Sequence, residues 1–434
     1  MIDTTFYAQL QAFERMHPFI PTEIVGEALS SRPEAWLDQF QSRLGQLGFT
    51  QPPLTTSTTS HPPIGKIPTL FYSERCTHSH STLLLYNSYS LSGNQPWHSL
   101  PILAYLQALE AVKHILGDLP LSIKWLIHFQ QDTETDLLPA FLRANQARLQ
   151  ANACLWDDTI GTSEAGLNAA SAPLLLLGSK GRLGVSLHTT SPQAASHSMH
   201  GGIAPGAAWR LLWALQSIKD EHEQIHLKGF YDAIELPTEE LLQATAELPD
   251  RSELLRQRWG LPALALDLKG LQLHYTQLLV PTCSLTTLTG LPFSANASDN
   301  GEHVVTHAQA NLDFHLVAGQ VPERVYTQLR HHLDARAFHD VQTRWRYGYP
   351  PTPAQAPDVP FVQLARASSE LAYGQRPTLL PTTASSQPLA LLASQHSLPF
   401  VITALAGEAE TSAFTRQAAL LLASFAQRKK SGER

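Results

Sequence analysis

The sequence predicts an α/β protein, namely an α/β/α sandwich interrupted by an inserted α+β domain of the ferredoxin-like type. Short apolar strand candidates alternate with helices over the first 180 or so residues, which is typical of a mostly parallel sheet covered on both faces. The pattern then changes: in "ANLDFHLVAG" (310–319) every second residue is apolar, which indicates a half-buried strand. The first pattern resumes from about residue 350, so both chain ends contribute to the sandwich.

The sandwich elements follow from hydrophobic periodicity. The helix expected at 100–117 has its apolar residues on one stripe and Gly117 to close it. Short apolar runs predict the strands. The expected strands are 69–75, 82–88, 121–129, 153–156 and 399–405, and the other expected helices are 137–152, 360–373 and 411–428, preceded by two or three helices within 5–48.

The middle of the chain predicts a separate inserted domain. A long helix is expected at 206–218, followed by a polar, charged region of more than forty residues. The strand at 310–319 leads into a helix at 322–335, with Pro322 in its first turn, and a strand at 341–348 follows. We therefore predict three segments: a catalytic-type domain in two parts, with an insert between them that serves as a lid and dimerisation domain (1–182, 183–347 and 348–434).

Composition excludes several classes of protein. The 434 residues carry 30 basic and 37 acidic side chains, a net charge of −7, without a basic stripe suited to nucleic acid. No apolar run approaches the length of a membrane span. Three scattered cysteines and an N-terminus unlike a signal peptide predict a cytoplasmic protein.

Several stretches resemble, in order, the motifs of one enzyme family. "LLLYNSYS" resembles LLLxGHxD, "ANACLWDDT" resembles a strand ending in SDT, and "ANLDFHLVAGQVPERV" resembles AxxxFRLVPGQxPExV. "SHSMHGGIAPGAAWRLLWAL" resembles LHSGxxGGxxxNPAxxLxxxL. The chain is similar to the zinc-dependent aminoacylase, dipeptidase and carboxypeptidase G family, which includes acetylornithine deacetylase and succinyl-diaminopimelate desuccinylase. The resemblance implies two zinc ions bridged by a carboxylate, a glutamate general base and a dimerising insert.

Most positions of that zinc site hold unsuitable residues. Ser88 and Ser90 stand at the positions of the family's first His and the Asp that orients it, and Gln131 stands at the position of the general base. Asp132 replaces a ligand Glu, and Asp158 matches a retained ligand Asp. The loop with the bridging Asp is shortened to "LSGNQPWHS", and "GEAETSAFTR" has no histidine where the last ligand belongs. Two carboxylates cannot complete a zinc shell, so we expect no zinc pair.

The resemblance also suggests substrate-contacting residues. His197 matches a histidine that reaches the partner's site in family dimers, although a surface or interface role is the plainer alternative. His315 falls on the arginine that pairs with the substrate carboxylate, so a bidentate clamp is lost. Ser385 and Ser386 lie where the family has a substrate loop, and a plain loop is the alternative.

Two hypotheses for function remain open. The first is a non-hydrolytic or repurposed homologue that binds a peptide-like or acyl-amino-acid ligand, or a partner protein. The second is an active amidohydrolase, peptidase or acyl-transfer enzyme with altered, metal-poor chemistry. Either way we expect no cofactor, or at most one weakly bound divalent metal such as zinc. The expected partner is a second copy, or an active relative, bound through the insert. Cys76, His78 and His80 alternate along the chain and could form a replacement metal site, but an exposed loop or strand edge is the plainer interpretation.

Overall fold

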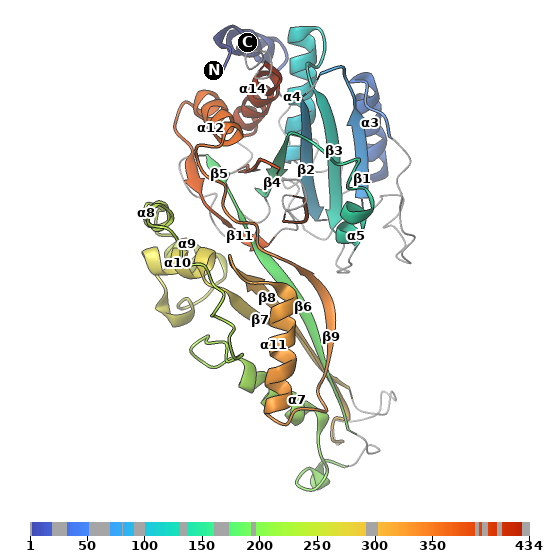
Figure 1. Ribbon diagram of the computed structural model, residues 1–434, viewed down its shortest axis with the longest axis vertical. Coiled ribbons are helices and arrows are strands. Elements are labelled where there is room, and N and C mark those ends of the chain that lie inside the picture. Colours follow the sequence, from blue (N-terminus) through green and yellow to red (C-terminus); the bar gives the residue numbers. More distant parts are fainter. Residues whose placement is uncertain are drawn as a thin grey trace.

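Two sheets organise the chain in the computed structural model (Figure 1). The first is seven-stranded, in the order β1-β3-β2-β4-β12-β5-β10. Its strands are β1 (Leu70–Arg75), β2 (Thr82–Ser90), β3 (Ser122–Gln130), β4 (Ala153–Asp157), β5 (Leu174–Leu176), β10 (Thr378–Leu380) and β12 (Phe400–Ala404). The structure describes residues 2–19, 33–51, 70–79, 81–90, 100–130, 137–159, 173–191, 197–291, 303–386, 390–392, 398–405 and 410–427.

The centre of this sheet is parallel. Strands β3, β2, β4 and β12 run in the same direction, whereas β1 is antiparallel to β3 and β5 is antiparallel to β12. The central strands are apolar on both faces, because helices cover both faces. The carboxyl ends of β2, β3 and β4 therefore meet at one edge of the sheet.

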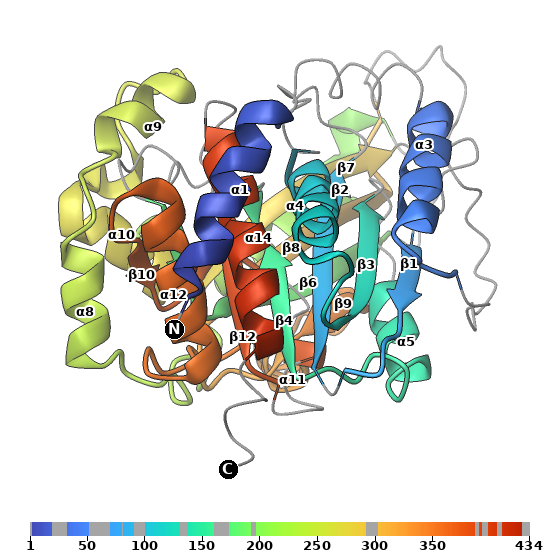
Figure 2. The ribbon, with the colours of Figure 1, turned by 90° about the horizontal axis from the view of Figure 1, so that it is seen from above.

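Helices form a layer on each face of the sheet, as the two ribbon views show (Figures 1 and 2). One layer packs on Leu83, Leu85 and Trp125. It contains α1 (Thr4–Met16), α3 (Pro33–Gln46), α4 (Leu100–Leu116), α12 (Pro360–Tyr373) and α14 (Thr411–Gln427). The opposite layer packs on Tyr86 and Trp156 and includes α5 (Leu137–Ala144). The α/β/α sandwich predicted from the sequence is confirmed.

The inserted part has a ferredoxin-like arrangement. In chain order its elements are β6 (Ser179–Thr190), α7 (Ala207–Ile218), β7 (Thr282–Leu291), β8 (His307–Leu316), α11 (Pro322–Ala335) and β9 (Gln342–Tyr349). The strands pair antiparallel in the order β9-β6-β8-β7, with α7 and α11 on the sheet, which is the β-α-β-β-α-β motif. The predicted segment boundaries at 182/183 and 347/348 fall inside β6 and β9, and these exact boundaries stay a prediction.

Two stretches differ from the sequence expectation. The helix α5 ends at Ala144 rather than at residue 152, and the Asn145 side chain and backbone N–H both donate to the Phe141 carbonyl at 3.0 Å where it ends. The polar region after α7 contains helices that were not predicted: α8 (Glu239–Ala246), α9 (Ser252–Arg258) and α10 (Gly270–Leu279). Its side chains Leu248 and Leu278 reach the core of the first sheet.

No helix in the described part of the chain is long and apolar enough to cross a bilayer.

Candidate functional site

The candidate site lies at the carboxyl ends of β3, β2 and β4, where open α/β sheets place their ligands. Ser88 on β2 pairs in register with His128 on β3, and Ser88 is buried. Side chains on a strand alternate between faces, so Tyr86 and Ser88 point to the same face of the sheet. The backbone of Ser90 ends β2 beside Gln130, but its side chain is outside the described part.

Several predicted positions cannot be placed. Gln131 and Asp132 lie outside the described residues, and so do residues 91–99 and 406–409. His80 of the alternative metal motif also lies outside them. Cys76 is exposed and follows the end of β1, in a stretch that is not part of the strand.

Asp158 follows β4 directly and is almost completely buried. Its backbone N–H donates to the Thr403 carbonyl at 2.9 Å. Its Oδ2 atom accepts hydrogen bonds from the hydroxyls of Thr383 and Ser385, both at 2.6 Å. The structure therefore joins Asp158 to the serine-bearing strand at 383–386, more than two hundred residues later in the sequence.

The adjacent Asp157 points to the other face of the sheet. Its carboxylate accepts the Thr159 hydroxyl at 2.6 Å, and its charge affects Tyr105 of α4. Burial raises the pKa of Asp157 to about 8, the nearby charge of Asp158 acts in the same direction, and the Thr159 hydrogen bond opposes both. Asp157 and Asp158 are therefore not an acid pair on one face.

Two aromatic side chains pack in the core behind the site, and both Tyr86 and Trp156 are completely buried. The rings of Tyr86 and Trp156 lie 3.8 Å apart at 32°, and the Tyr86 hydroxyl is 3.4 Å from His128 Nδ1. Burial raises the pKa of Tyr86, with further contributions from Tyr349 and Asp158. Burial lowers the pKa of His128 to about 4, so its imidazole is neutral at physiological pH.

Sequence reasoning missed Tyr86, His128 and Trp156. Each lies two residues before, or directly beside, a position that was considered: Tyr86 precedes Ser88 by two, and Trp156 precedes Asp158 by two. The period of two along a strand would have placed them on the same face. The sequence reasoning treated them only as parts of strands.

His315 joins the insert to the same region. Its Nδ1 lies 2.8 Å from the Ser386 hydroxyl oxygen, and that hydroxyl donates to the Gly181 carbonyl at 2.7 Å. The hydroxyl has one proton, so the imidazole is the donor to Ser386. Burial lowers the pKa of His315 to about 4 although the Asp313 carboxylate, 3.8 Å from Nε2, opposes this. His315 is therefore neutral and does not supply the positive charge of the family arginine.

The cations nearest His315 are already engaged. Arg182 lies beside His315 in the sheet register and binds Asp313 through two nitrogens at 2.6–3.0 Å. Lys180 donates to the Val280 carbonyl at 2.7 Å, and burial lowers its pKa to about 7. These contacts leave the region rich in hydroxyl, phenol and imidazole groups.

His197 is not part of this arrangement within the chain. It precedes the short helix η3 (Ser198–His200), where its Nδ1 accepts the Met199 N–H at 3.2 Å. It forms an isolated bridge with His303, beyond the end of β6. Since Gly181 and Thr190 are nine residues apart on β6, that end is roughly 30 Å from the Gly181 region.

The described residues do not fit a zinc pair. Among them there is no group of three or more His, Cys, Asp or Glu side chains that could hold a metal ion. The retained Asp158 already accepts two hydroxyls on one oxygen, and a catalytic zinc needs three protein ligands. The donor set is thus that of a hydrogen-bonding site.

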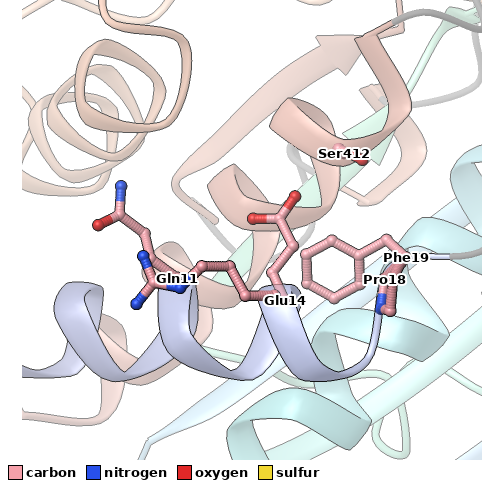
Figure 3. Close-up of a pocket in the computed structure, with 6 residues that line it drawn as sticks. Gln11, Glu14, Pro18, Phe19 and Ser412 are labelled. Carbon is pink, nitrogen blue, oxygen red and sulfur yellow. The ribbon is translucent and has the colours of Figure 1, made fainter.

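A separate hollow of about 430 Å³ lies between α1 and α14 and shares no residue with this site (Figure 3). Its Glu14 carboxylate accepts hydrogen bonds from Arg416 at 2.8 and 3.0 Å. The charged groups of this hollow are thus partly committed to holding the two helices together.

Comparisons with known proteins establish the fold. No protein-family model and no curated protein matches the sequence. The M20 family metallo-carboxypeptidase Sso-CP2 from Sulfolobus solfataricus matches with a TM-score of 0.73 and 21% identity, over 91% of this chain and 96% of its own. The di-peptidase Dug1p from Saccharomyces cerevisiae matches with 0.73 and 15%, over 98% of both chains.

Human carnosine dipeptidase 1 gives a similar result, with a TM-score of 0.73 and 16% identity over 98% of both chains. This protein therefore has the fold of the M20 metallopeptidases and dipeptidases, across nearly its whole length. The resemblance read from the sequence motifs is confirmed at the level of the fold.

Proposed function

We propose that this protein is a repurposed member of the metallopeptidase fold that binds a peptide-like or acyl-amino-acid ligand without two-zinc hydrolysis. The observation that carries the proposal is the state of Asp158. The carboxylate that matches a zinc ligand is buried and accepts hydroxyls from Thr383 and Ser385. Ser88, on the neighbouring strand, offers a hydroxyl where the family has an imidazole.

The chemistry of the site suits an amide-bearing ligand. Hydroxyls, a phenol and neutral imidazoles can each donate or accept a hydrogen bond, as an amide requires. The tilted, fully buried rings of Tyr86 and Trp156 give these polar groups an apolar backing, and small-molecule sites combine apolar surroundings with a few polar groups. The neutral His315 favours ligands that do not depend on a guanidinium–carboxylate pair.

The decisive experiment is metal analysis combined with turnover. We expect purified protein to contain well below one equivalent of zinc and to leave N-acyl-amino acids and dipeptides intact. Two equivalents of zinc, with turnover abolished by a chelator, would refute the proposal. Turnover by metal-free protein would instead favour the alternative, an amidohydrolase, peptidase or acyl-transfer enzyme with altered chemistry.

Binding is tested separately with the ligands themselves. An N-acetylated amino acid or a dipeptide should bind measurably by calorimetry, and Trp156→Leu should weaken binding because it disturbs the buried packing that supports the end of β4. Trp345→Leu, on a strand of the insert away from β4, is the matched control and should bind as the native protein does. Equal affinities of the two variants would contradict this placement of the site.

The insert supports a proposed homodimer. The outer face of α7 exposes Trp209, Leu212 and Trp213, and the edge strand β7 exposes Leu285 and Leu288. An open strand edge beside an apolar helix face favours pairing with a second chain.

Light scattering after size exclusion should therefore give a dimer, which Leu288→Lys and Trp213→Glu convert to a monomer. A native monomer that dimerises only with an active relative would support the mixed dimer instead. The cytoplasm remains the compartment that the cysteine content predicts.

A further inference from the structure

One four-residue strand, β11 (Thr383–Ser386), makes side-chain hydrogen bonds to both halves of the molecule. On one side, the Thr383 and Ser385 hydroxyls donate to Asp158 at the end of β4, in the first sheet. On the other side, Ser386 bonds to His315 of β8 and to the Gly181 carbonyl of β6, in the second sheet. The Tyr349 hydroxyl of β9 also donates to the Ser386 carbonyl at 3.1 Å.

Three of the places where the chain crosses between the two sheets touch one another. They are β5 to β6, β9 to α12, and β10 to β11 (Figure 1). Gly178 lies in the first crossing, and a Cβ atom there would be 2.6 Å from the Pro381 carbonyl oxygen and 2.8 Å from that of Thr352. Those two oxygens belong to the other two crossings. The three backbones are therefore in direct contact, so one cannot bend without displacing the others.

We propose that β11 and this backbone contact form a latch that holds the inserted domain at one fixed angle to the α/β domain. Rotation of the insert would have to break bonds on one side of β11. The Asp158 bonds join hydroxyls to a buried carboxylate, and hydrogen bonds to charged groups are stronger than those between neutral groups. Strand β11 itself is paired in parallel with the start of β6, so it moves with the insert.

The latch goes beyond the proposed function, and metal content does not decide it. Its test is the distribution of distances between the two domains, measured by pulsed electron paramagnetic resonance. Cys76 is the exposed native cysteine of the first domain, whereas Cys154 and Cys283 are buried. A second label at His331→Cys, an exposed position on α11, reports on the insert. We expect one narrow distance peak, unchanged by zinc chloride or by a dipeptide.

The latch variant is Thr383→Val, Ser385→Ala and Ser386→Ala. We expect it to lose the single peak and show a broadened or split distribution. The matched control, Thr415→Val with Ser368→Ala, removes buried hydroxyls inside one domain and should keep the native peak. A broad distribution in native protein, or a latch variant indistinguishable from the control, would overturn the proposal.

If the latch variant does not fold, the distance distribution of the native protein still tests the proposal by itself. Ser385→Ala, which removes one of the two hydroxyl donors to Asp158, provides the milder comparison. It should broaden the peak less than the triple change does.

Discussion

The ion pair between Arg182 and Asp313 lies inside the insert, close to the domain junction, and its removal gives the sharpest quantitative prediction. Arg182 Nε and Nη2 contact the Asp313 carboxylate at 2.6–3.0 Å, and Asp313 also accepts the Tyr347 hydroxyl at 3.3 Å. The Arg182 guanidinium lies 4.9 Å from the centre of the Tyr347 ring. Burial alone would lower the pKa of Arg182, but the hydrogen bonds and charge of Asp313 raise it.

Asp313→Ala should lower the free energy of unfolding of the insert by about 3 kcal/mol. Breaking a buried pair costs about 3–5 kcal/mol, because an uncompensated charge stays buried. The lower end applies here since the Arg182 side chain is 30% exposed whereas that of Asp313 is 6% exposed, so water screens part of the remaining charge.

The assay is hydrogen exchange of the β6 and β8 amides, which reports local stability in a two-domain protein. Arg182→Met and the double variant complete a mutant cycle, and we expect a coupling energy of about 2 kcal/mol. Single-variant costs that add to the double-variant cost within about 0.5 kcal/mol would refute the reasoning.

Two further changes test the junction and the backbone. His315 has a folded-state pKa of about 4, below its ordinary 6.5. Its contribution to stability is therefore fully present above pH 6.5 and is lost as the pH falls towards 4, by at most about 1.4 kcal/mol per pH unit. His315→Gln should flatten this part of the curve of melting temperature against pH, and parallel curves for the two proteins would contradict the prediction. Gly319 has a φ of +87°, and a Cβ there would lie 1.8 Å from the Ala233 carbonyl oxygen. Gly117 has a similar φ of +81°, but its Cβ would meet nothing within 4 Å, so Gly117→Ala should cost about 1–2 kcal/mol. Gly319→Ala should destabilise the protein far more, and equal melting temperatures of the two variants would contradict this.

Much of the fold was predictable because it depends on local pattern. The run of apolar residues in 82–88 and the single apolar stripe in 100–117 predict a buried strand and the helix that covers it, and both form. The predicted end of α5 at residue 152 was wrong, since the helix stops at Ala144 and hydrophobic periodicity does not mark where a helix ends. The helices α8 to α10 were missed since their flanking apolar residues are buried by the distant first sheet.

The candidate site was only partly predictable. Asp158, His315, Ser385 and Ser386 were each chosen separately, by resemblance to family positions. Their sequence positions do not indicate that Asp158 binds Ser385 or that His315 binds Ser386, because those contacts form only when three crossings between the sheets come together. Tyr86 and Trp156 were not singled out because a tyrosine or tryptophan in an apolar strand is explained as core, and both are indeed buried there, directly behind the site.

The sequence by itself determined the α/β class and the presence of an insert, since these depend on residue type and short-range order along the chain; the lost zinc ligands stay a prediction from the resemblance. Only the tertiary structure decided what the surviving carboxylate does. Asp158 is a hydrogen-bond acceptor for β11 because folding brings the end of β4 and a strand more than two hundred residues later within 2.6 Å. Hydrogen bonds act over such short distances that only the folded chain can specify which groups they join.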